Sequence, residues 1–250
     1  MHWRETNGLR WLEADLPNAR VAFTTRVGGV SARPYESLNL AILTGDRRDD
    51  VRENRHRVAR ALGLAPDRIV IGRQVHGAEV ATHDDAPEHS AYADPGPNLP
   101  AADGHATGRG RIAPLVMVAD CLPVAVAGAD GVAMLHCGWR GMAGGIVETG
   151  VRTVRAVDAA VGPGIGPCCY EVGDEVRGRF EDLGEGIFDG RMLDLREVAR
   201  RLLGRAGVDE VEVSELCTRC NPELFYSHRR DGERTGRQAG LVWRDASCRG

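Results

Sequence analysis

Short apolar runs alternate with glycine-rich and polar segments along the whole chain, a pattern that predicts many short strands. Runs with strand-like composition lie at residues 19–25, 69–75, 115–118, 123–127, 132–135, 211–213 and 238–243. The turn Ala129-Asp130-Gly131 separates two of these runs and predicts a β-hairpin. No run reaches the roughly 18 apolar residues that a membrane-spanning helix needs, so no membrane partner is expected.

Helices are predicted where apolar residues recur every three or four positions. This spacing favours helices at 49–62, 141–156, 171–182 and 194–206. Gly63 is suited to end the first of them, and Asp194 is suited to cap the start of the last. Residues 84–103 are rich in Pro, Asp and Ala, so we expect a long surface loop there. Because no repeat, linker or break in composition divides the chain, we expect one α+β domain over residues 1–250.

The composition is that of a folded soluble protein, and it narrows the range of partners. Apolar residues make up 42% of the 250 residues and charged residues 27%. The formal net charge is −4 without a basic block, which argues against a nucleic-acid partner. All 32 basic residues are arginine, which excludes a Schiff-base lysine and a Walker-type lysine. No apolar signal segment is visible, so we expect a cytoplasmic protein whose 7 cysteines are thiols or metal ligands rather than disulfides.

Three side chains that are suited to chemistry each stand at the end of an apolar run. They are His76, Cys121 and His136. Two imidazoles and one thiolate suit zinc, and three protein ligands leave a fourth position for water or substrate. Alternatively, Cys121 is a thiolate nucleophile and His136 is its base. Each residue taken singly is also compatible with a structural role, and the spacing alone leaves these alternatives open.

A second group of cysteines lies in the C-terminal part of the chain. Cys217 and Cys220 form a CxxC pair, a spacing typical of zinc sites, but no second CxxC pair accompanies it. Cys168 and Cys169 can be placed beside this pair, although adjacent cysteines do not easily bind one tetrahedral ion without strain. We therefore expect unpaired thiols, with a second zinc site or a reversible disulfide as alternatives.

Two glycine-rich segments invite comparison with phosphate-binding loops. The turn at 25–29 combines backbone N–H groups with the guanidinium of Arg26, which suits an anionic oxygen, although a plain turn with a surface arginine is the alternative. The segment 162–166 has no lysine and fits neither the P-loop nor the GxGxxG pattern. Asp103 and Asp120 are either groups that orient an imidazole or ordinary turn aspartates.

Several motifs occur in order along the chain. They are TTRVGGVS at 24–31, SLNL at 37–40, QVHG at 74–77, ADG at 102–104, ADCLP at 119–123, HCGWRG at 136–141, GPGIG at 162–166 and GRQA at 236–239. From about residue 20 to 243 this order resembles the YfiH/laccase-domain family, also called the multicopper polyphenol oxidase or DUF152 family. The resemblance implies a single-domain four-layer α/β/β/α sandwich with mixed sheets, the YfiH-like fold that is shared with a bacterial toxin domain.

The resemblance also implies a site and an activity. The implied site is a zinc ion bound by His76, Cys121 and His136, which are also the implied catalytic residues. The implied activity is that of a purine nucleoside phosphorylase, which converts adenosine, inosine, guanosine or methylthioadenosine and phosphate to the base and ribose 1-phosphate. Adenosine deaminase activity is implied in addition.

A mechanism for these implied activities gives the metal and the substrate contacts separate tasks. In deamination, zinc would lower the pKa of a water that attacks C6 of adenine. In phosphorolysis, the metal or Arg26 would position the phosphate that attacks C1′ of the ribose. We expect Arg26, Asn39 and Arg140 to contact substrate or phosphate. The expected partners are small nucleosides and phosphate, bound by a monomer or a small homo-oligomer.

Three alternative functions remain open at this point. Some members of the family are described as copper-dependent laccases, but multicopper oxidases need several histidine-rich sites, and the 8 histidines of this chain are scattered without an HxH motif. The second alternative is a cysteine hydrolase of the amidase or peptide-editing type, with Cys121 as nucleophile, His136 as base and His76 as orienting group. The third is a non-catalytic partner protein that uses a Trp139-Arg140 surface.

Overall fold

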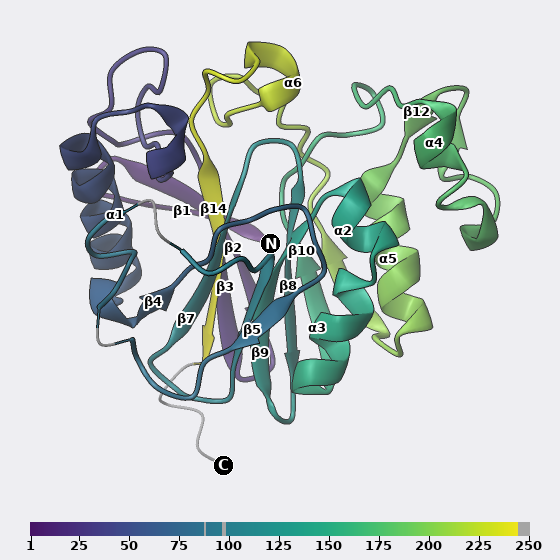
Figure 1. The fold of residues 1–250 in the computed structure, drawn as a ribbon, viewed down its shortest axis with the longest axis horizontal. Coiled ribbons are helices and arrows are strands. Elements are labelled where there is room, and N and C mark those ends of the chain that lie inside the picture. The colour runs from purple at the N-terminus through teal and green to yellow at the C-terminus, as the bar shows by residue number, and fades with distance from the viewer. Residues whose placement is uncertain (88, 97–98, 245–250) are drawn as a thin grey trace.

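The computed structural model describes residues 1–87, 89–96 and 99–244, whose strands form two six-stranded sheets that pack against each other (Figure 1). The first sheet has the order β1 (His2–Thr6), β2 (Leu9–Leu16), β3 (Ala19–Thr24), β14 (Gln238–Arg244), β7 (Ala113–Val118) and β4 (Ile69–Val70). The second has the order β13 (Glu210–Val213), β10 (Ala156–Val161), β8 (Leu122–Gly128), β9 (Gly131–Cys137), β6 (Gly104–Thr107) and β5 (Val80–Thr82). Parallel and antiparallel pairs occur in both sheets, so both are mixed.

Helices cover the outer face of each sheet. The first sheet carries α1 (Arg48–Leu62), and the second carries α2 (Trp139–Ala143), α3 (Ile146–Val154) and α5 (Leu195–Arg205) (Figure 1). The shorter elements are η1 (Ile42–Thr44), η2 (Pro66–Arg68), α4 (Asp174–Arg177), η3 (Glu181–Leu183), β11 (Phe188–Asp189), β12 (Met192–Leu193) and α6 (His228–Asp231). The arrangement is the four-layer α/β/β/α sandwich that the sequence motifs imply.

Each pair of layers encloses its own hydrophobic core. Phe23, Met134 and Val242 fill the space between the two sheets. The apolar stripe of α1, which includes Val58, packs on the first sheet, and that of α3, which includes Val151, packs on the second. Burial of these stripes holds the layers together. Within the described ranges, no helix combines the length and the hydrophobicity needed to cross a bilayer.

Several local predictions are confirmed with the expected physical cause. Helix α1 ends at Gly63, whose φ of 69° lies in the left-handed region that glycine adopts most easily. Helix α5 begins after Asp194, whose carboxylate accepts hydrogen bonds from the backbone N–H groups of Arg196 and Glu197. Strands β8 and β9 pair antiparallel down to the Gly128–Gly131 pair, so the predicted hairpin is present.

Other predicted elements are shorter than expected, or interrupted. The helix predicted at 141–156 is divided into α2 and α3 because Gly144 and Gly145 separate them, the latter with a φ of 90°. Ala156 then belongs to strand β10 rather than to the helix. The helix predicted at 171–182 is reduced to one turn of α4 and the 3₁₀ turn η3. The strand predicted at 69–75 is regular only at residues 69–70, with one isolated bridge further on between Arg73 and Ala101.

Two regions at the edges of the fold differ from the sequence analysis in another way. Strands β1 and β2 form an N-terminal hairpin that the sequence analysis did not predict, although β2 buries most of its residues. The described residues of the predicted loop at 84–103 form no regular element longer than a turn, but Tyr92 among them is fully buried and its hydroxyl donates to the Arg55 carbonyl at 3.0 Å. Positions 88, 97 and 98 of this loop lie outside the described residues.

The β8–β9 hairpin determines where the candidate chemistry lies. Its register pairs Leu122 with Cys137 and Pro123 with His136. Cys121, which immediately precedes β8, and His136, near the end of β9, therefore stand at the same end of the second sheet. This end is opposite the hairpin turn and faces α2 and α6, at the top of Figure 1.

Candidate metal centre and its cavity

The structure brings together the three side chains that the sequence places at the ends of apolar runs. One ligand atom from each of His76, Cys121 and His136 lies within 4.8 Å of the others. The two imidazole rings meet edge to face, with centroids 4.9 Å apart and planes at 64°. His136 is buried, Cys121 is half-buried and His76 is exposed. We call these three residues the cavity cluster.

The backbone around the cavity cluster is unusual at the positions that present the ligand atoms. His76 has a φ of 60° and Asp120, directly before Cys121, has a φ of 92°, both in the left-handed region. Such strained positions are concentrated at functional sites. A Cβ atom on Gly138 would lie 3.0 Å from the Cys121 sulfur and 3.3 Å from Cδ2 of His76. Only glycine therefore leaves the sulfur and the imidazole undisturbed at position 138.

A fully buried carboxylate organises the cavity cluster from behind. Asp103 accepts backbone hydrogen bonds from Val75 at 2.9 Å, His76 at 2.9 Å and Gly77 at 2.8 Å, which fixes the loop that carries His76. It also accepts a hydrogen bond from Nδ1 of His136 at 2.8 Å. This contact assigns the proton of neutral His136 to Nδ1, so its Nε2 is left as the atom that can bind a metal.

The electrostatics of the cavity cluster favour a thiolate. Burial raises the pKa of Cys121, but the neighbouring His136 and His76 outweigh it and lower that pKa to about 6. Burial lowers the pKa of His136, but the Cys121 thiolate and Asp103 outweigh it and raise that pKa to about 9. Burial also raises the pKa of Asp103, yet the hydrogen bonds from His136, Val75 and Gly77 outweigh it and bring that pKa to about 2. The Cys121 thiolate therefore faces a His136 ring whose charged form is favoured, and a metal ion bound at Nε2 would displace the second proton of that ring.

The donor set of the cavity cluster fits a single zinc ion. A thiolate and two imidazoles are ligands that zinc prefers. These three protein ligands leave one tetrahedral position open, as in catalytic zinc sites. The contact between Asp103 and His136 is the carboxylate–histidine arrangement that orients metal ligands in proteins. Copper also accepts these ligands, so the donor set fits one ion without selecting zinc over copper.

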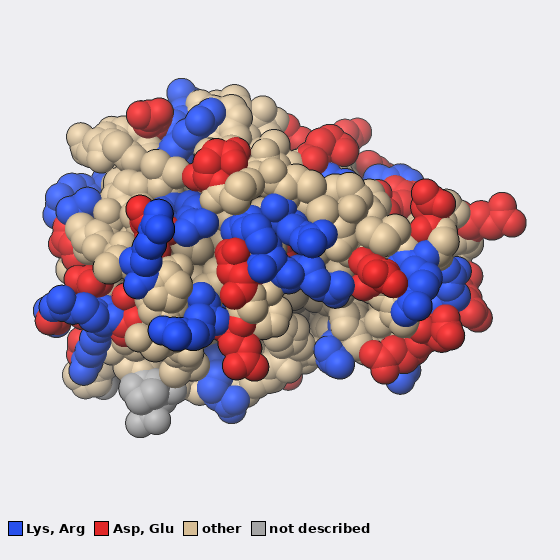
Figure 2. Space-filling view, turned by 90° about the horizontal axis from the view of Figure 1, so that it is seen from above, with Lys and Arg blue, Asp and Glu red and all other residues tan. Residues whose placement is uncertain are grey.

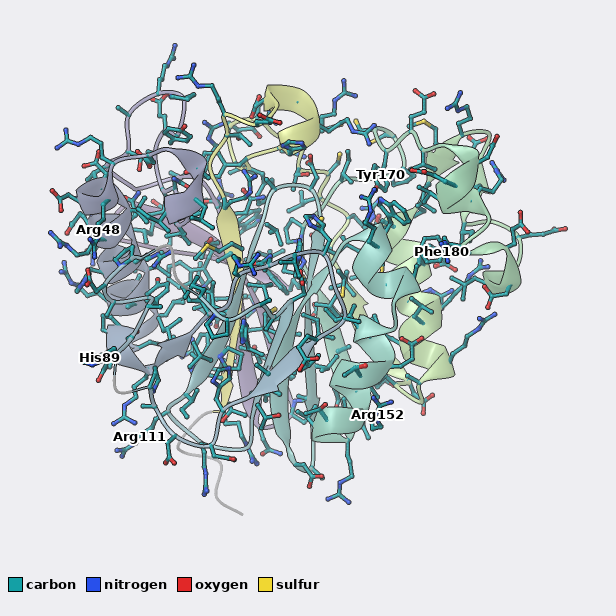
Figure 3. All side chains as sticks on the ribbon, in the orientation of Figure 1. Arg48, His89, Arg111, Arg152, Tyr170 and Phe180 are labelled. Atoms are coloured by element: carbon teal, nitrogen blue, oxygen red, sulfur yellow. The ribbon has the colours of Figure 1, made fainter. Side chains whose placement is uncertain are left out.

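The cavity cluster lies in the wall of a cavity at this end of the molecule. The cavity has a volume of about 520 Å³, within the range of roughly 300–1,000 Å³ typical of small-molecule sites. Its lining combines apolar side chains with aromatic and cationic ones; besides the cluster these include Leu43, Ile71, Met117, Trp139, Tyr170, Arg73, Arg140, Arg229 and Arg237. Figure 3 labels Tyr170 at this end of the molecule, above α2.

The cationic side chains of the lining are held in place without being neutralised. The Arg140 guanidinium lies 4.2 Å from the centre of the Trp139 ring, and that of Arg229 lies 5.2 Å from the centre of the Tyr170 ring. Within the described part of the chain, no carboxylate forms an ion pair with Arg73, Arg140 or Arg229. Figure 2 looks onto this end and shows arginine side chains gathered across the middle of the face. The cavity is thus suited to an anionic ligand.

Two residues that the sequence analysis assigned to substrate lie outside this cavity. The guanidinium of Arg26 donates to the backbone carbonyls of Glu36 and Pro222 and lies over the Tyr226 ring, so each of its three nitrogens already donates a hydrogen bond. Asn39 is fully buried. Its amide donates to Asp46 and its carbonyl accepts from the backbone of Arg237, so it supports the lining from behind.

Asn39 and Arg26 therefore hold backbone in place, because their polar atoms are committed to neighbouring groups. Arg140, the third predicted contact, does line the cavity. Asp120 accepts hydrogen bonds from the Thr218 hydroxyl and from the backbone N–H of Arg229, both at 2.6 Å, rather than from an imidazole. Asp103 alone has the orienting role that the sequence suggested for the pair.

Sequence reasoning missed several residues of the lining. Arg73 and Arg229 carry no motif that marks them as binding residues, and Tyr170 was not singled out. The available signal was proximity to marked positions, because Arg73 lies just before the QVHG motif and Tyr170 just after GPGIG.

The chain is similar over most of its length to a group of bacterial proteins. Residues 20–245 match the family described as multi-copper polyphenol oxidoreductase laccase. A protein of Deinococcus radiodurans named purine nucleoside phosphorylase is 41% identical over 259 residues, covering 94% of this chain and 93% of the relative. The Escherichia coli protein named purine nucleoside phosphorylase YfiH is 37% identical over 233 residues, covering 88% of this chain and 91% of the relative.

A solved structure extends this similarity to three dimensions. The crystal structure of YlmD from Geobacillus stearothermophilus superposes with a TM-score of 0.88 at 35% sequence identity. The superposition covers 96% of this chain and 97% of that one. The arrangement of layers is therefore shared over nearly the full length of both chains.

Proposed function

The chain belongs to the multi-copper polyphenol oxidoreductase laccase family, also known as the YfiH/laccase-domain family, and from this membership we propose that it is a metal-dependent purine nucleoside phosphorylase. The observation that carries the proposal is the position of the cavity cluster in the wall of an arginine-lined cavity of about 520 Å³. A nucleoside and a phosphate are the kind of ligands, one aromatic and one anionic, that such a lining can accept. Adenosine deamination is proposed as an activity of the same site.

The proposed cofactor is one zinc ion held by His76, Cys121 and His136. When bound, zinc would supply a Lewis acid and a means of lowering the pKa of a water. Asp103 accepts a hydrogen bond from Nδ1 and so keeps the His136 ring oriented. The ring of this ligand is therefore already fixed before the metal binds. Gly138 leaves the space that the sulfur and the His76 ring occupy.

The chain's own residues divide the work of phosphorolysis. An oxygen of phosphate bonds to C1′ of the ribose, the bond from C1′ to the purine nitrogen breaks, and the leaving base takes up a proton. Arg140 and Arg229, whose charges are not neutralised by carboxylates of the described residues, are the proposed contacts to phosphate. Trp139 and Tyr170 present aromatic faces along the same wall, suited to stack on a purine. Holding both reactants in one cavity lowers the entropic part of the barrier.

The proposed substrates are adenosine, inosine, guanosine and methylthioadenosine. The polyphenol oxidase alternative requires several copper ions, and the cavity cluster offers only two histidines. His83 and His105 form a separate pair, with Nε2 and Nδ1 3.1 Å apart, rather than extending the cluster. The single-ion site therefore supports nucleoside chemistry better than multicopper chemistry.

The cysteine hydrolase alternative is favoured by one specific observation. Asp103, His136 and Cys121 form an acid–base–nucleophile series, in which the carboxylate orients the imidazole and the imidazole faces a thiolate. The same contacts orient metal ligands, so occupancy decides between the two functions. Rapid labelling of Cys121 by iodoacetamide in native protein purified without metal would favour the hydrolase, whereas stoichiometric zinc that protects Cys121 favours the phosphorylase.

The test of the proposed function combines metal analysis with product identification. Purified protein is analysed for zinc and copper and then incubated with adenosine and phosphate. The products are separated and identified by mass spectrometry. We expect zinc, adenine and ribose 1-phosphate, with inosine as the deamination product. The exchange His76→Ala should remove the zinc of the cavity cluster and both activities together, while the exposed His89, at the lower left of Figure 3, provides the control His89→Ala. Full phosphorolysis by a His76→Ala protein that has lost the zinc of the cavity cluster would contradict the shared site.

A further inference from the structure

Four cysteines that lie outside the cavity converge from two loops. Cys168 and Cys169 belong to the loop after β10, whereas Cys217 and Cys220 belong to the segment after β13. One sulfur from each lies within 4.8 Å of the others. None of them lines the cavity. We call these residues the four-cysteine cluster.

The sulfur–sulfur distances match a single tetrahedral ion better than a disulfide. The Cys220 sulfur lies 3.6 Å from that of Cys168 and 3.3 Å from that of Cys169. Four sulfurs at about 2.3 Å from one zinc ion stand about 3.8 Å apart in a regular tetrahedron. A disulfide requires about 2.05 Å. Since all four sulfurs lie within 4.8 Å of one another, one ion can reach every one of them.

The backbone already directs a hydrogen bond at one sulfur of this cluster. The buried Cys217 sulfur accepts the N–H of Gly166 at 3.2 Å. Hydrogen bonds from backbone N–H groups to a ligating sulfur are the kind of outer contact that orients metal ligands.

The adjacent pair Cys168-Cys169 is presented by a tight turn rather than by an extended strand. The backbone N–H groups of Cys169 and Tyr170 both donate to the Gly166 carbonyl, at 3.0 and 3.1 Å. This turn brings both sulfurs toward Cys220 without further rearrangement, which removes the objection to adjacent ligands that the sequence alone raises.

We propose that the four-cysteine cluster binds one zinc ion through all four sulfurs, as a structural site separate from the cavity cluster. Four protein ligands close the coordination sphere, as in structural zinc sites. A four-cysteine cluster that closes around one ion thus has a stabilising role rather than a catalytic one.

The proposed ion joins the loop after β10, which contributes Ile165 and Tyr170 to the cavity lining, to the segment after β13 behind it. The Thr218 N–H donates to the Gly164 carbonyl at 3.0 Å, and the Thr218 hydroxyl donates to Asp120 at 2.6 Å, directly beside Cys121. Tyr170, which lines the cavity, directly follows Cys169. Zinc in the four-cysteine cluster would therefore hold Tyr170 and the Asp120 contact in place from outside the cavity.

Cobalt titration tests the site independently of enzymatic activity. In the variant Cys121→Ser the cavity cluster has no sulfur ligand, so any sulfur-to-cobalt charge-transfer absorption must come from elsewhere. We expect one equivalent of Co²⁺ to produce this absorption in Cys121→Ser, and the triple variant Cys121→Ser/Cys217→Ser/Cys220→Ser to lose it. The matched control Cys121→Ser/Cys137→Ala, which alters a buried core cysteine, should retain it. Absence of the absorption from Cys121→Ser, or its persistence in the triple variant, would overturn the proposal.

A second measurement needs no variant and covers the case in which the triple variant does not fold. Native protein is treated with iodoacetamide with and without zinc, and the labelled cysteines are identified by mass spectrometry. We expect zinc to protect all members of the four-cysteine cluster and a chelator to expose them. Equal labelling under both conditions, or a disulfide between two members in protein kept under reducing conditions, would refute the site. Because neither measurement involves nucleosides, failure of the proposed function leaves this test intact.

Discussion

The cavity cluster and the four-cysteine cluster both gather sulfur within reach of one ion, but they are built differently. The cavity cluster places two of its members at the ends of paired strands, has a buried carboxylate behind it and offers three donors. The four-cysteine cluster lies on loops, has two exposed members and offers four donors. Three preoriented donors leave a position for substrate, whereas four donors close the site. The number of donors and their support therefore separate a reactive site from a stabilising one.

The largest effect is expected from removing a ligand of the cavity cluster. The exchange Cys121→Ala should lower kcat/KM for adenosine phosphorolysis on the order of 10³-fold or more, because the metal that supplies the Lewis acid is lost. Steady-state kinetics with adenosine and phosphate check this. Cys137→Ala, a buried cysteine one residue after His136 on β9, serves as the control and should remain within about threefold of the parent. A comparable loss in the control would show that the effect is general unfolding.

The next effect concerns the carboxylate that distinguishes the cavity cluster from the four-cysteine cluster. Asp103→Asn keeps the shape but replaces one acceptor oxygen with a donor, so it disturbs the contact to His136 and the loop of His76. We expect roughly 10–100-fold weaker zinc binding at the cavity cluster, the range for groups that hydrogen-bond to metal ligands. Competition with a chromogenic chelator measures this affinity. Asp130, an exposed carboxylate that forms an ion pair with Arg155, gives the control Asp130→Asn. Unaltered zinc affinity in Asp103→Asn would contradict the role of the carboxylate.

How much of this could be predicted from sequence depends on whether a feature is local. The β8–β9 hairpin and the positions of Cys121 and His136 follow from two apolar runs and a short turn. The break between α2 and α3 depends on the conformation of Gly145, and the periodic apolar stripe conceals it. The sequence predicts that Arg26 binds phosphate, but its guanidinium donates to the carbonyl of Pro222, which is far away in the sequence. Contacts between distant loops are therefore the part that the sequence pattern does not carry.

A smaller effect should separate cationic residues in the cavity from those outside it. Arg140→Ala should raise KM for phosphate about tenfold with a smaller change in kcat, because one charge-assisted contact to the anion is lost. Arg26→Ala should leave KM for phosphate within about twofold, since Arg26 contacts backbone carbonyls instead. Varying phosphate at saturating adenosine measures both values. The reverse order of the two effects would place the phosphate outside the cavity. Arg152, exposed on α3 (Figure 3), supplies the control Arg152→Ala.

The smallest effect on turnover is expected at the four-cysteine cluster. The double variant Cys217→Ser/Cys220→Ser should change kcat by less than about threefold but lower the melting temperature by several degrees, because a structural zinc contributes folding energy. Thermal unfolding followed by circular dichroism, beside kinetics on the same preparation, checks this. A large loss of kcat without a change in melting temperature would reverse the assignment of the two clusters.

The measurement that tests the central claim most directly is phosphorolysis as a function of zinc occupancy. Metal-free protein is reconstituted with increasing zinc, and adenine and ribose 1-phosphate formation is followed together with iodoacetamide labelling of Cys121. If the cavity cluster is the zinc site of a phosphorylase, turnover should rise with zinc in step with protection of Cys121. Full turnover by the metal-free protein, with Cys121 labelled freely, would contradict the account.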